Sequence, residues 1–484
     1  MGGMTRSRTR TGKGLALAAI ILAVLASSSA VAANTTTEVV ADSRPNVVVF
    51  MTDDQNVSSL AVMPNVKALL ANAGTTFSNS FVAYPLCCPS RATYLTGQYP
   101  HNHDVLANSA PDGGYYQLRG DETLPVWLSR AGYQTAHIGK YLNGYGTQNP
   151  VEIPPGWGEW YGSVDPSTYR MWGYTINENG NLVTYGQDDV EDPALYQTDV
   201  YAKKAVDYVN RKAPGAAPFF LSVAPLAPHT EVGWASTNGN RNPRPAPRHR
   251  GAFANAPLPQ PASFNELDVN DKPAHIRALP LLDATAVAGI TKTYRSRLES
   301  LLAVDEAVKS IVDTLAARGE LANTLFVFTS DNGWLQGEHR IPNGKIHPYE
   351  ESIRVPLILR GPGVSTGTTS TVPAGNIDLA ATVLAVAQAT PGITIDGRSL
   401  LTVSGRTALL VETGPRSNGA RWYAAVRTAR FVYIEHSTGE RELYDLSIDP
   451  YQLRSRHADA AYAQVRAALA EQLHRLQACA GQTC

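Results

Sequence analysis

Short runs of apolar residues recur along the chain and predict buried strands. The clearest runs cover residues 46–52, 219–224 and 324–329, and segments 133–140 and 354–359 fit the same description. A nearly uninterrupted apolar run of this length is typical of a strand that is covered on both faces, as in a parallel sheet.

The segments between these runs have the periodicity of helices. We expect helices over 63–73, 124–131, 194–209 and 377–389, and an amphipathic helix with a regular apolar face over 297–315. Strands that alternate with helices predict an α/β fold, in which a mostly parallel sheet is flanked by helices.

The character of the chain changes after Ser404. Segments 408–412, 423–427 and 431–435 predict short antiparallel strands, and segment 460–476 predicts a helix. We therefore expect a main domain over 45–403 and a small C-terminal α+β subdomain over 404–484.

A long segment rich in proline, asparagine and arginine, residues 234–273, interrupts the main domain. A loop of this length inside a compact domain is usually functional or disordered. It fits two interpretations, a solvated surface excursion or a basic rim that attracts an anionic substrate. The arginines concerned are Arg241, Arg244, Arg248 and Arg250.

The N-terminus has the parts of a secretory signal peptide. Basic residues between Arg6 and Lys13 precede an apolar stretch over 15–26, and Ala30-Val31-Ala32 fits a cleavage site. We expect residues 1–32 to be removed and the mature protein to be secreted or extracytoplasmic. The net charge of −1 provides no basic field for nucleic acid, which we exclude as a partner.

Export permits disulfide bonds, although the chain has only four cysteines. Cys479 and Cys484 enclose a short loop and fit a disulfide. Cys87 and Cys88 are neighbours, and a bond between neighbours would strain the backbone.

Two predicted strands end in acidic residues. The strand over 46–52 runs into Asp53 and Asp54, and the strand over 324–329 is followed by Asp331 and Asn332. Because ligands of open parallel sheets bind at the carboxyl ends of strands, these side chains are expected to gather at one place. Carboxylates held that close are unfavourable without a cation, and an all-oxygen set suits a hard ion. We predict one divalent cation here, with Ca²⁺ preferred to Mg²⁺.

Cys87 heads the most informative motif, Cys-Cys-Pro-Ser-Arg-Ala-Thr-Tyr-Leu-Thr-Gly over 87–97. This run resembles the signature of type I sulfatases of the alkaline phosphatase superfamily. In that family the first cysteine is oxidised to formylglycine, an aldehyde, by a formylglycine-generating enzyme. The resemblance implies an alkaline-phosphatase-like fold and a sulfuric ester hydrolase. It also implies a hydrated aldehyde at position 87 that attacks sulfur while it is bound to the cation.

The resemblance assigns roles to residues that match the family's other motifs. Arg91 corresponds to a residue that stabilises the formylglycine hydrate, and His229 to the acid that protonates the leaving group. Lys140 and Lys345 correspond to lysines that bind sulfate. The metal ligands correspond to Asp53, Asp54, Asp331, Asn332 and the modified Cys87.

One position departs from the family pattern. Many sulfatases have a histidine two residues after the first of these lysines, which assists breakdown of the sulfo-enzyme, and here Leu142 takes that place. We hypothesise that His103 contributes to this step, because it follows the signature closely. The alternative is that His101 and His103 merely cap the chain or bind substrate.

Segments 87–91, 98–103, 139–143 and 155–157 resemble the N-acetylglucosamine-6-sulfatase branch, which includes the extracellular heparan sulfatases. The implied partner is a sulfated small molecule or glycan, either a carbohydrate sulfate such as N-acetylglucosamine-6-sulfate or an aryl sulfate. Four aromatic residues fit either stacking on sugar rings or packing in the core. They are Trp157, Trp160, Tyr161 and Trp172.

Two other functions remain open at this point. A phosphoester or phosphonate hydrolase of the same superfamily would share the metal site and the anion pocket. A catalytically silent protein that binds sulfated glycans would result if Cys87 stayed unmodified, although such a protein would not need this metal set. The sequence leaves the oligomeric state undetermined.

Overall fold

The computed structural model describes residues 42–213, 215–232, 242–402, 406–414 and 422–484. The expected signal peptide and Arg241 therefore lie outside the described residues. Within the described ranges, no helix combines the length and the hydropathy that a membrane span requires.

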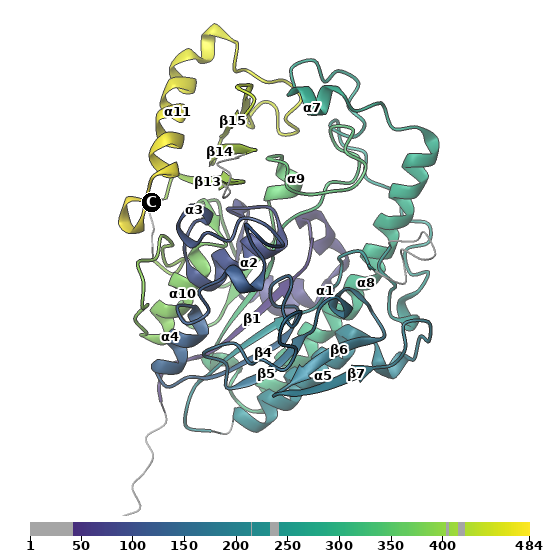
Figure 1. Ribbon diagram of the computed structural model, residues 1–484, viewed down its shortest axis with the longest axis vertical. Coiled ribbons are helices and arrows are strands. Elements are labelled where there is room, and N and C mark those ends of the chain that lie inside the picture. The colour runs from purple at the N-terminus through teal and green to yellow at the C-terminus, as the bar shows by residue number, and fades with distance from the viewer. Residues whose placement is uncertain (1–41, 214, 233–241, 403–405, 415–421) are drawn as a thin grey trace, which may run out of the picture. The chain divides into compact units, whose positions relative to one another are not determined.

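A ten-stranded sheet forms the centre of the fold (Figure 1), in the order β11-β2-β10-β9-β1-β8-β4-β5-β6-β7. The strands in the middle of this order are parallel to one another. They include the most continuous apolar runs of the chain, as predicted for strands that are covered on both faces. The parallel strands are β9 (Thr324–Ser330), β1 (Asn46–Thr52), β8 (Phe219–Ala224), β4 (Gln134–Gly139) and β5 (Glu159–Ser163).

Antiparallel pairing occurs at both margins of the sheet, where β10 pairs with β9 and β2, and β6 pairs with β5 and β7. β3 and β12 form a separate two-stranded sheet. The marginal strands are β10 (Leu357–Arg360), β2 (Thr75–Phe77), β11 (Thr368–Ser370), β6 (Tyr174–Glu178) and β7 (Asn181–Tyr185). The separate pair is β3 (Ser80–Phe81) and β12 (Ala374–Gly375).

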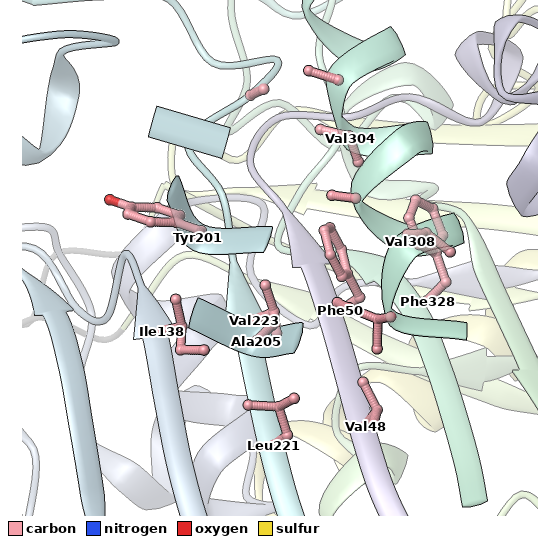
Figure 2. Close-up of a cluster of buried hydrophobic side chains, with 14 of the residues drawn as sticks. Val48, Phe50, Ile138, Tyr201, Ala205, Leu221, Val223, Val304, Val308 and Phe328 are labelled. Carbon is pink, nitrogen blue, oxygen red and sulfur yellow. The ribbon is translucent and has the colours of Figure 1, made fainter. Parts of the chain in front are cut away.

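Successive residues of each strand point to opposite sides of the sheet, and in these apolar strands both sides are therefore apolar. Helices cover both faces. Val48 and Phe50 of β1 pack in one apolar cluster with Tyr201 of α5 and Val304 of α8 (Figure 2). Val47 and Val49 belong to a second cluster with residues of α2, α4 and α10. The helices are α5 (Gln197–Lys212), α8 (Ala284–Ala317), α2 (Cys87–Thr96), α4 (Leu124–Arg130) and α10 (Asp378–Ala387).

The C-terminal region forms an antiparallel sheet in the order β13-β14-β15-β16, and α11 (Ala463–Gln477) runs beside it (Figure 1). The sequence predicted three of these strands. The fourth was missed because it carries charged residues, and one of them, Glu442, is buried and accepts hydrogen bonds from Tyr349 and Tyr444. The disulfide between Cys479 and Cys484 is present, as predicted. The strands are β13 (Ala408–Glu412), β14 (Tyr423–Thr428), β15 (Phe431–His436) and β16 (Arg441–Asp445).

Two helix predictions differ from the structure. The helix expected over 63–73 is a short α1 (Pro64–Val66) that continues as a π-helical turn, η2 (Lys67–Ala71). The helix expected over 297–315 begins earlier, at Ala284, because the Asp283 side chain accepts a hydrogen bond from the Ala286 N–H at 2.8 Å and caps its start. Short helices complete the fold: α3 (Pro100–His103), α7 (Ala274–Arg277) and α9 (Glu350–Ile353).

The described arginines of the 234–273 segment do not form a basic rim. Arg244 is buried and forms ion pairs with Glu231 at 2.7 Å and Asp188 at 2.8 Å. Arg248 and Arg250 also pair with carboxylates, so the positive charge of these three residues is neutralised within the fold. For them the basic-rim interpretation is wrong.

The aromatic residues considered for sugar stacking belong to the protein interior. Trp160 and Trp172 are fully buried, and Trp157 is 6% exposed. Tyr161 is partly buried and packs against the main core cluster. Of the two interpretations, core packing is the one that the structure supports.

Candidate active site

Four neighbouring parallel strands supply most of the polar residues that the sequence analysis selected. Asp53 and Asp54 follow β1, and Asp331 and Asn332 follow β9, at the ends that the parallel register places side by side. Lys140 follows β4, and His229 lies a few residues beyond β8. The order β9-β1-β8-β4 therefore brings these groups to one edge of the sheet.

Cys87 is the first residue of α2, so its side chain lies at the positive end of the helix dipole. Leu86, in an extended conformation, precedes the helix, and Pro89 stands in the first turn, where a missing N–H costs no helical hydrogen bond. Gly97 ends the helix with a φ of 66°, a left-handed conformation that favours glycine. The local sequence thus determines where the helix begins and ends, and with it the position of Cys87.

The thiol of Cys87 is buried among charged groups. Its Sγ lies 2.8 Å from Lys345 Nζ and 3.5 Å from Asp53 Oδ1. Lys345 also donates to Asp54, and Lys140 donates to Asp53. Burial raises the pKa of Cys87 to about 12, and the carboxylate of Asp53 adds to this effect. The unmodified thiol is therefore a poor nucleophile at neutral pH, because the thiolate is the reactive form.

Arg91 connects three of the strand ends. Its Nε lies 2.8 Å from Asp331 Oδ2, one terminal nitrogen lies 3.5 Å from Asp53 Oδ2, and the other donates to the Lys140 carbonyl at 2.7 Å. Burial raises the pKa of Asp331 to about 6, and the charge of Asp53 acts in the same direction, against Arg91. Burial also tends to raise the pKa of Asp53, but the attraction of Lys140 and the other cations outweighs it and holds this pKa below its usual value.

Two buried oxygens at the strand ends have no hydrogen-bond partner among the described residues, Asp54 Oδ2 and Asn332 Oδ1. Asp54 also has a φ of 65°, a left-handed conformation that is uncommon for residues other than glycine. One ligand atom from each of Asp53, Asp54, Cys87 and His229 lies within 4.8 Å of the others. Buried oxygens without partners, beside carboxylates, fit the donor set of a hard divalent cation.

His229 lies at the rim of this cluster. Its Nε2 is 3.6 Å from Asp54 Oδ2, and its Nδ1 faces the carbonyl of Thr230. Burial lowers the pKa of His229, although the nearby carboxylates act in the opposite direction. The ring is therefore held with one nitrogen facing the acidic cluster.

Tyr169 belongs to the same cluster, although the sequence analysis did not select it. Lys140 Nζ lies 4.7 Å from the centre of its ring, and the His229 ring lies 5.2 Å away. Its hydroxyl accepts a hydrogen bond from Asn143 Nδ2 at 2.5 Å. Tyr169 ends a short 3₁₀ helix, η4 (Ser167–Tyr169), and is one of 22 tyrosines, so no periodicity or motif distinguishes it in the sequence.

The structure does not bring His103 into the cluster. Its Nε2 lies 3.0 Å from Thr93 Oγ1, and its Nδ1 accepts the N–H of Val105 at 3.1 Å. Burial lowers its pKa to about 3. Both ring nitrogens are thus engaged within the chain. His101 is likewise engaged, with Nδ1 lying 2.6 Å from Glu412 Oε1.

Comparison with known proteins gives matches over most of the chain. The family model described as "Sulfatase" matches residues 45–389. The model described as "N-sulphoglucosamine sulphohydrolase, C-terminal" matches residues 337–479.

Two sulfatases are similar to this chain over more than nine-tenths of its length. An arylsulfatase of Volvox carteri is 34% identical over 509 aligned positions, covering 93% of this chain and 77% of that protein. An N-acetylglucosamine-6-sulfatase of Homo sapiens is 33% identical and covers 91% of this chain and 86% of that protein. A solved structure of a protein in complex with its substrate D-glucosamine-2-N,6-O-disulfate has a TM-score of 0.74 and 26% identity, covering 90% of this chain and 97% of that chain.

Proposed function

The chain belongs to the sulfatase family, and we propose that it is an exported enzyme that removes sulfate from 6-O-sulfated glucosamine units. The observation that carries the proposal is the position of Cys87 at the head of α2, with Lys345 Nζ 2.8 Å and Asp53 Oδ1 3.5 Å from its sulfur. In this family's chemistry, that is where the reacting group lies. The expected signal peptide supports export.

Two similarities support a glucosamine sulfate as the substrate. One relative is named N-acetylglucosamine-6-sulfatase, and one structural neighbour holds D-glucosamine-2-N,6-O-disulfate as its substrate. Another relative is named arylsulfatase. Aryl sulfates need only the pocket for the sulfate group, so we expect them to serve as additional substrates.

We propose that a formylglycine-generating enzyme converts Cys87 to formylglycine, whose hydrate provides the nucleophile. Such a conversion accounts for a cysteine at this position whose own thiol has a raised pKa. A divalent cation, Ca²⁺ in preference to Mg²⁺, would supply positive charge that acidifies a hydroxyl group and polarises the sulfate. The residues that would hold it are Asp53, Asp54, Asp331 and Asn332, together with the modified Cys87.

The remaining residues have roles that follow from their charges. Lys140 and Lys345 would neutralise the sulfate oxygens, and Arg91 would hold the hydrate and the carboxylate of Asp331 in place. His229 would donate a proton to the leaving oxygen, because a sugar alkoxide is too basic to leave unprotonated. Tyr169 would position Lys140 and His229 relative to each other.

One experiment tests the central claim. The peptide that contains position 87 is analysed by mass spectrometry in protein from its own host, and the same protein is assayed with N-acetylglucosamine-6-sulfate, nitrophenyl sulfate and the matching phosphate esters. We expect an aldehyde at position 87 and sulfate release that exceeds phosphate release. An unmodified thiol in an active protein, or release of phosphate alone, would refute the proposal.

A further inference from the structure

An open pocket of about 500 Å³ lies outside the candidate active site, and acidic and amide side chains are among its lining residues. The pocket is formed by residues 56–58, which follow Asp53 and Asp54, by the loop around residues 336–338, and by α9. Three of its lining residues, Gln336, Glu338 and Glu351, carry side-chain oxygens.

The two carboxylates of this group have no basic partner. Among the described residues, no lysine or arginine forms an ion pair with Glu338 or Glu351, whereas the neighbouring Glu350 pairs with Arg427 at 2.7 Å. Glu338 Oε2 accepts the N–H of Gln336 at 2.5 Å, and Glu351 Oε1 faces Ser263 Oγ at 3.5 Å. Glu351 Oε2 is buried and has no hydrogen-bond partner in the described chain.

Gln336 provides a third oxygen and an independent indication of a ligand. The residue is only 6% exposed, and its Oε1 has no hydrogen-bond partner within the described ranges. Leaving a buried polar oxygen unpaired is unfavourable, so such an oxygen normally faces a bound group. Gln336 lines the same pocket as Glu338 and Glu351.

The charges of the two carboxyl groups in the pocket act on each other. Burial raises the pKa of Glu351 to about 8, and the charge of Glu338 acts in the same direction. Burial likewise raises the pKa of Glu338. A positive charge between the two carboxyl groups would offset their repulsion and favour the ionised form of both. An all-oxygen donor set without histidine or cysteine suits a hard cation better than zinc.

We propose that Gln336, Glu338 and Glu351 bind a Ca²⁺ ion at a second site, distinct from the catalytic cation site. The ion would join the loop around Gln336 to α9, which begins five residues after Lys345. The expected role is structural, since this ion would stabilise the loop region that carries Lys345.

The test counts bound Ca²⁺ in purified full-length protein by equilibrium dialysis. The background variant is Asp54→Asn, which removes a carboxylate of the catalytic site. We expect this variant to retain one Ca²⁺ per chain and to lose it when Glu351→Gln is added. Addition of Ca²⁺ is also expected to raise the melting temperature of Asp54→Asn and to leave that of the double variant unchanged.

A matched control is Glu350→Gln in the same background, because Glu350 lines the pocket but already pairs with Arg427. This control variant is expected to retain one bound Ca²⁺ per chain. Glu338→Gln is a second disruptive variant, for use if the first does not fold by circular dichroism. The proposal is overturned if Asp54→Asn binds no Ca²⁺, or if the count stays at one after Glu351→Gln or Glu338→Gln.

Discussion

Lys345 Nζ lies 2.8 Å from Cys87 Sγ and also donates a hydrogen bond to Asp54, so one ammonium group contacts both the expected reacting residue and an expected metal ligand. The two residues are far apart in the sequence, since Cys87 begins α2 and Lys345 lies in the loop before α9. A substitution of Lys345 is therefore expected to affect the nucleophile, the bound cation and the sulfate at the same time.

Exchange of Cys87 is expected to abolish activity. Cys87→Ala removes the residue that would carry the aldehyde, and sulfate release should fall roughly 10⁴-fold or more, as for other catalytic nucleophiles. Cys88→Ala is the matched control, because Cys88 is equally buried but packs in the apolar cluster. It should retain activity at a stability cost of about 1 kcal/mol. Inactivity of Cys88→Ala with an active Cys87→Ala would reverse this assignment.

Removal of divalent cations is expected to inactivate the enzyme reversibly. Because a catalytic cation contributes several kcal/mol to the transition state, chelation should lower turnover on the order of 10³-fold, and added Ca²⁺ should restore it. Asn332→Leu removes one of the two strand-end oxygens that have no hydrogen-bond partner among the described residues, and should weaken the response to Ca²⁺. Full activity in excess chelator, with no bound metal by elemental analysis, would contradict this prediction.

Exchange of His229 is expected to affect substrates unequally. His229→Asn should lower turnover of a sugar sulfate by about 10²–10⁴-fold, because the leaving alkoxide then lacks its proton donor. Nitrophenyl sulfate has an acidic leaving group and should be affected much less. Equal losses on both substrates would indicate that His229 positions the sulfate instead.

Tyr169 is expected to act through its ring and its hydroxyl separately. Tyr169→Phe keeps the ring beside Lys140 but loses the hydrogen bond from Asn143, so kcat/KM should fall by up to about 10-fold. Tyr169→Ala also loses the ring contact, so its kcat/KM should be lower still. If both variants lower only thermal stability and leave the kinetic constants unchanged, the role is structural.

The pocket at Glu351 predicts a pH dependence of stability in the presence of a chelator. The pKa of Glu351 is raised from 4.5 to about 8, by burial and by Glu338 and Glu350, while hydrogen bonds from its own backbone N–H and from Ser263 act against this. The folded chain therefore keeps a proton that the unfolded chain loses, and stability should fall as the pH rises through this interval. Urea unfolding should show a flatter profile for Glu351→Gln, since glutamine does not titrate. If Glu351→Gln leaves the pH profile of stability unchanged, Glu351 is not the cause of the pH dependence.

Much of the site was predictable because it depends on strand ends. In a parallel sheet the carboxyl ends of neighbouring strands meet at one edge, so the two recognised strands led to the expectation that Asp53 and Asp331 gather there. The structure supplied the pairing of β1 with β9. His103 shows the limit of this reasoning. It follows the signature closely in sequence, but the turn after α2 directs its ring toward Thr93 and the backbone.

The sequence by itself determined the buried parallel strands, the acidic residues at their ends and the C-terminal disulfide. Each of these depends on local periodicity, on turn residues or on cysteines a few positions apart. Only the tertiary structure decided that Tyr169 joins Lys140 and His229, that Arg244 is neutralised by Glu231, and that Glu338 and Glu351 share a pocket. These contacts depend on how loops from separate strands pack, and the charge of a side chain does not reveal which partner the fold will bring to it.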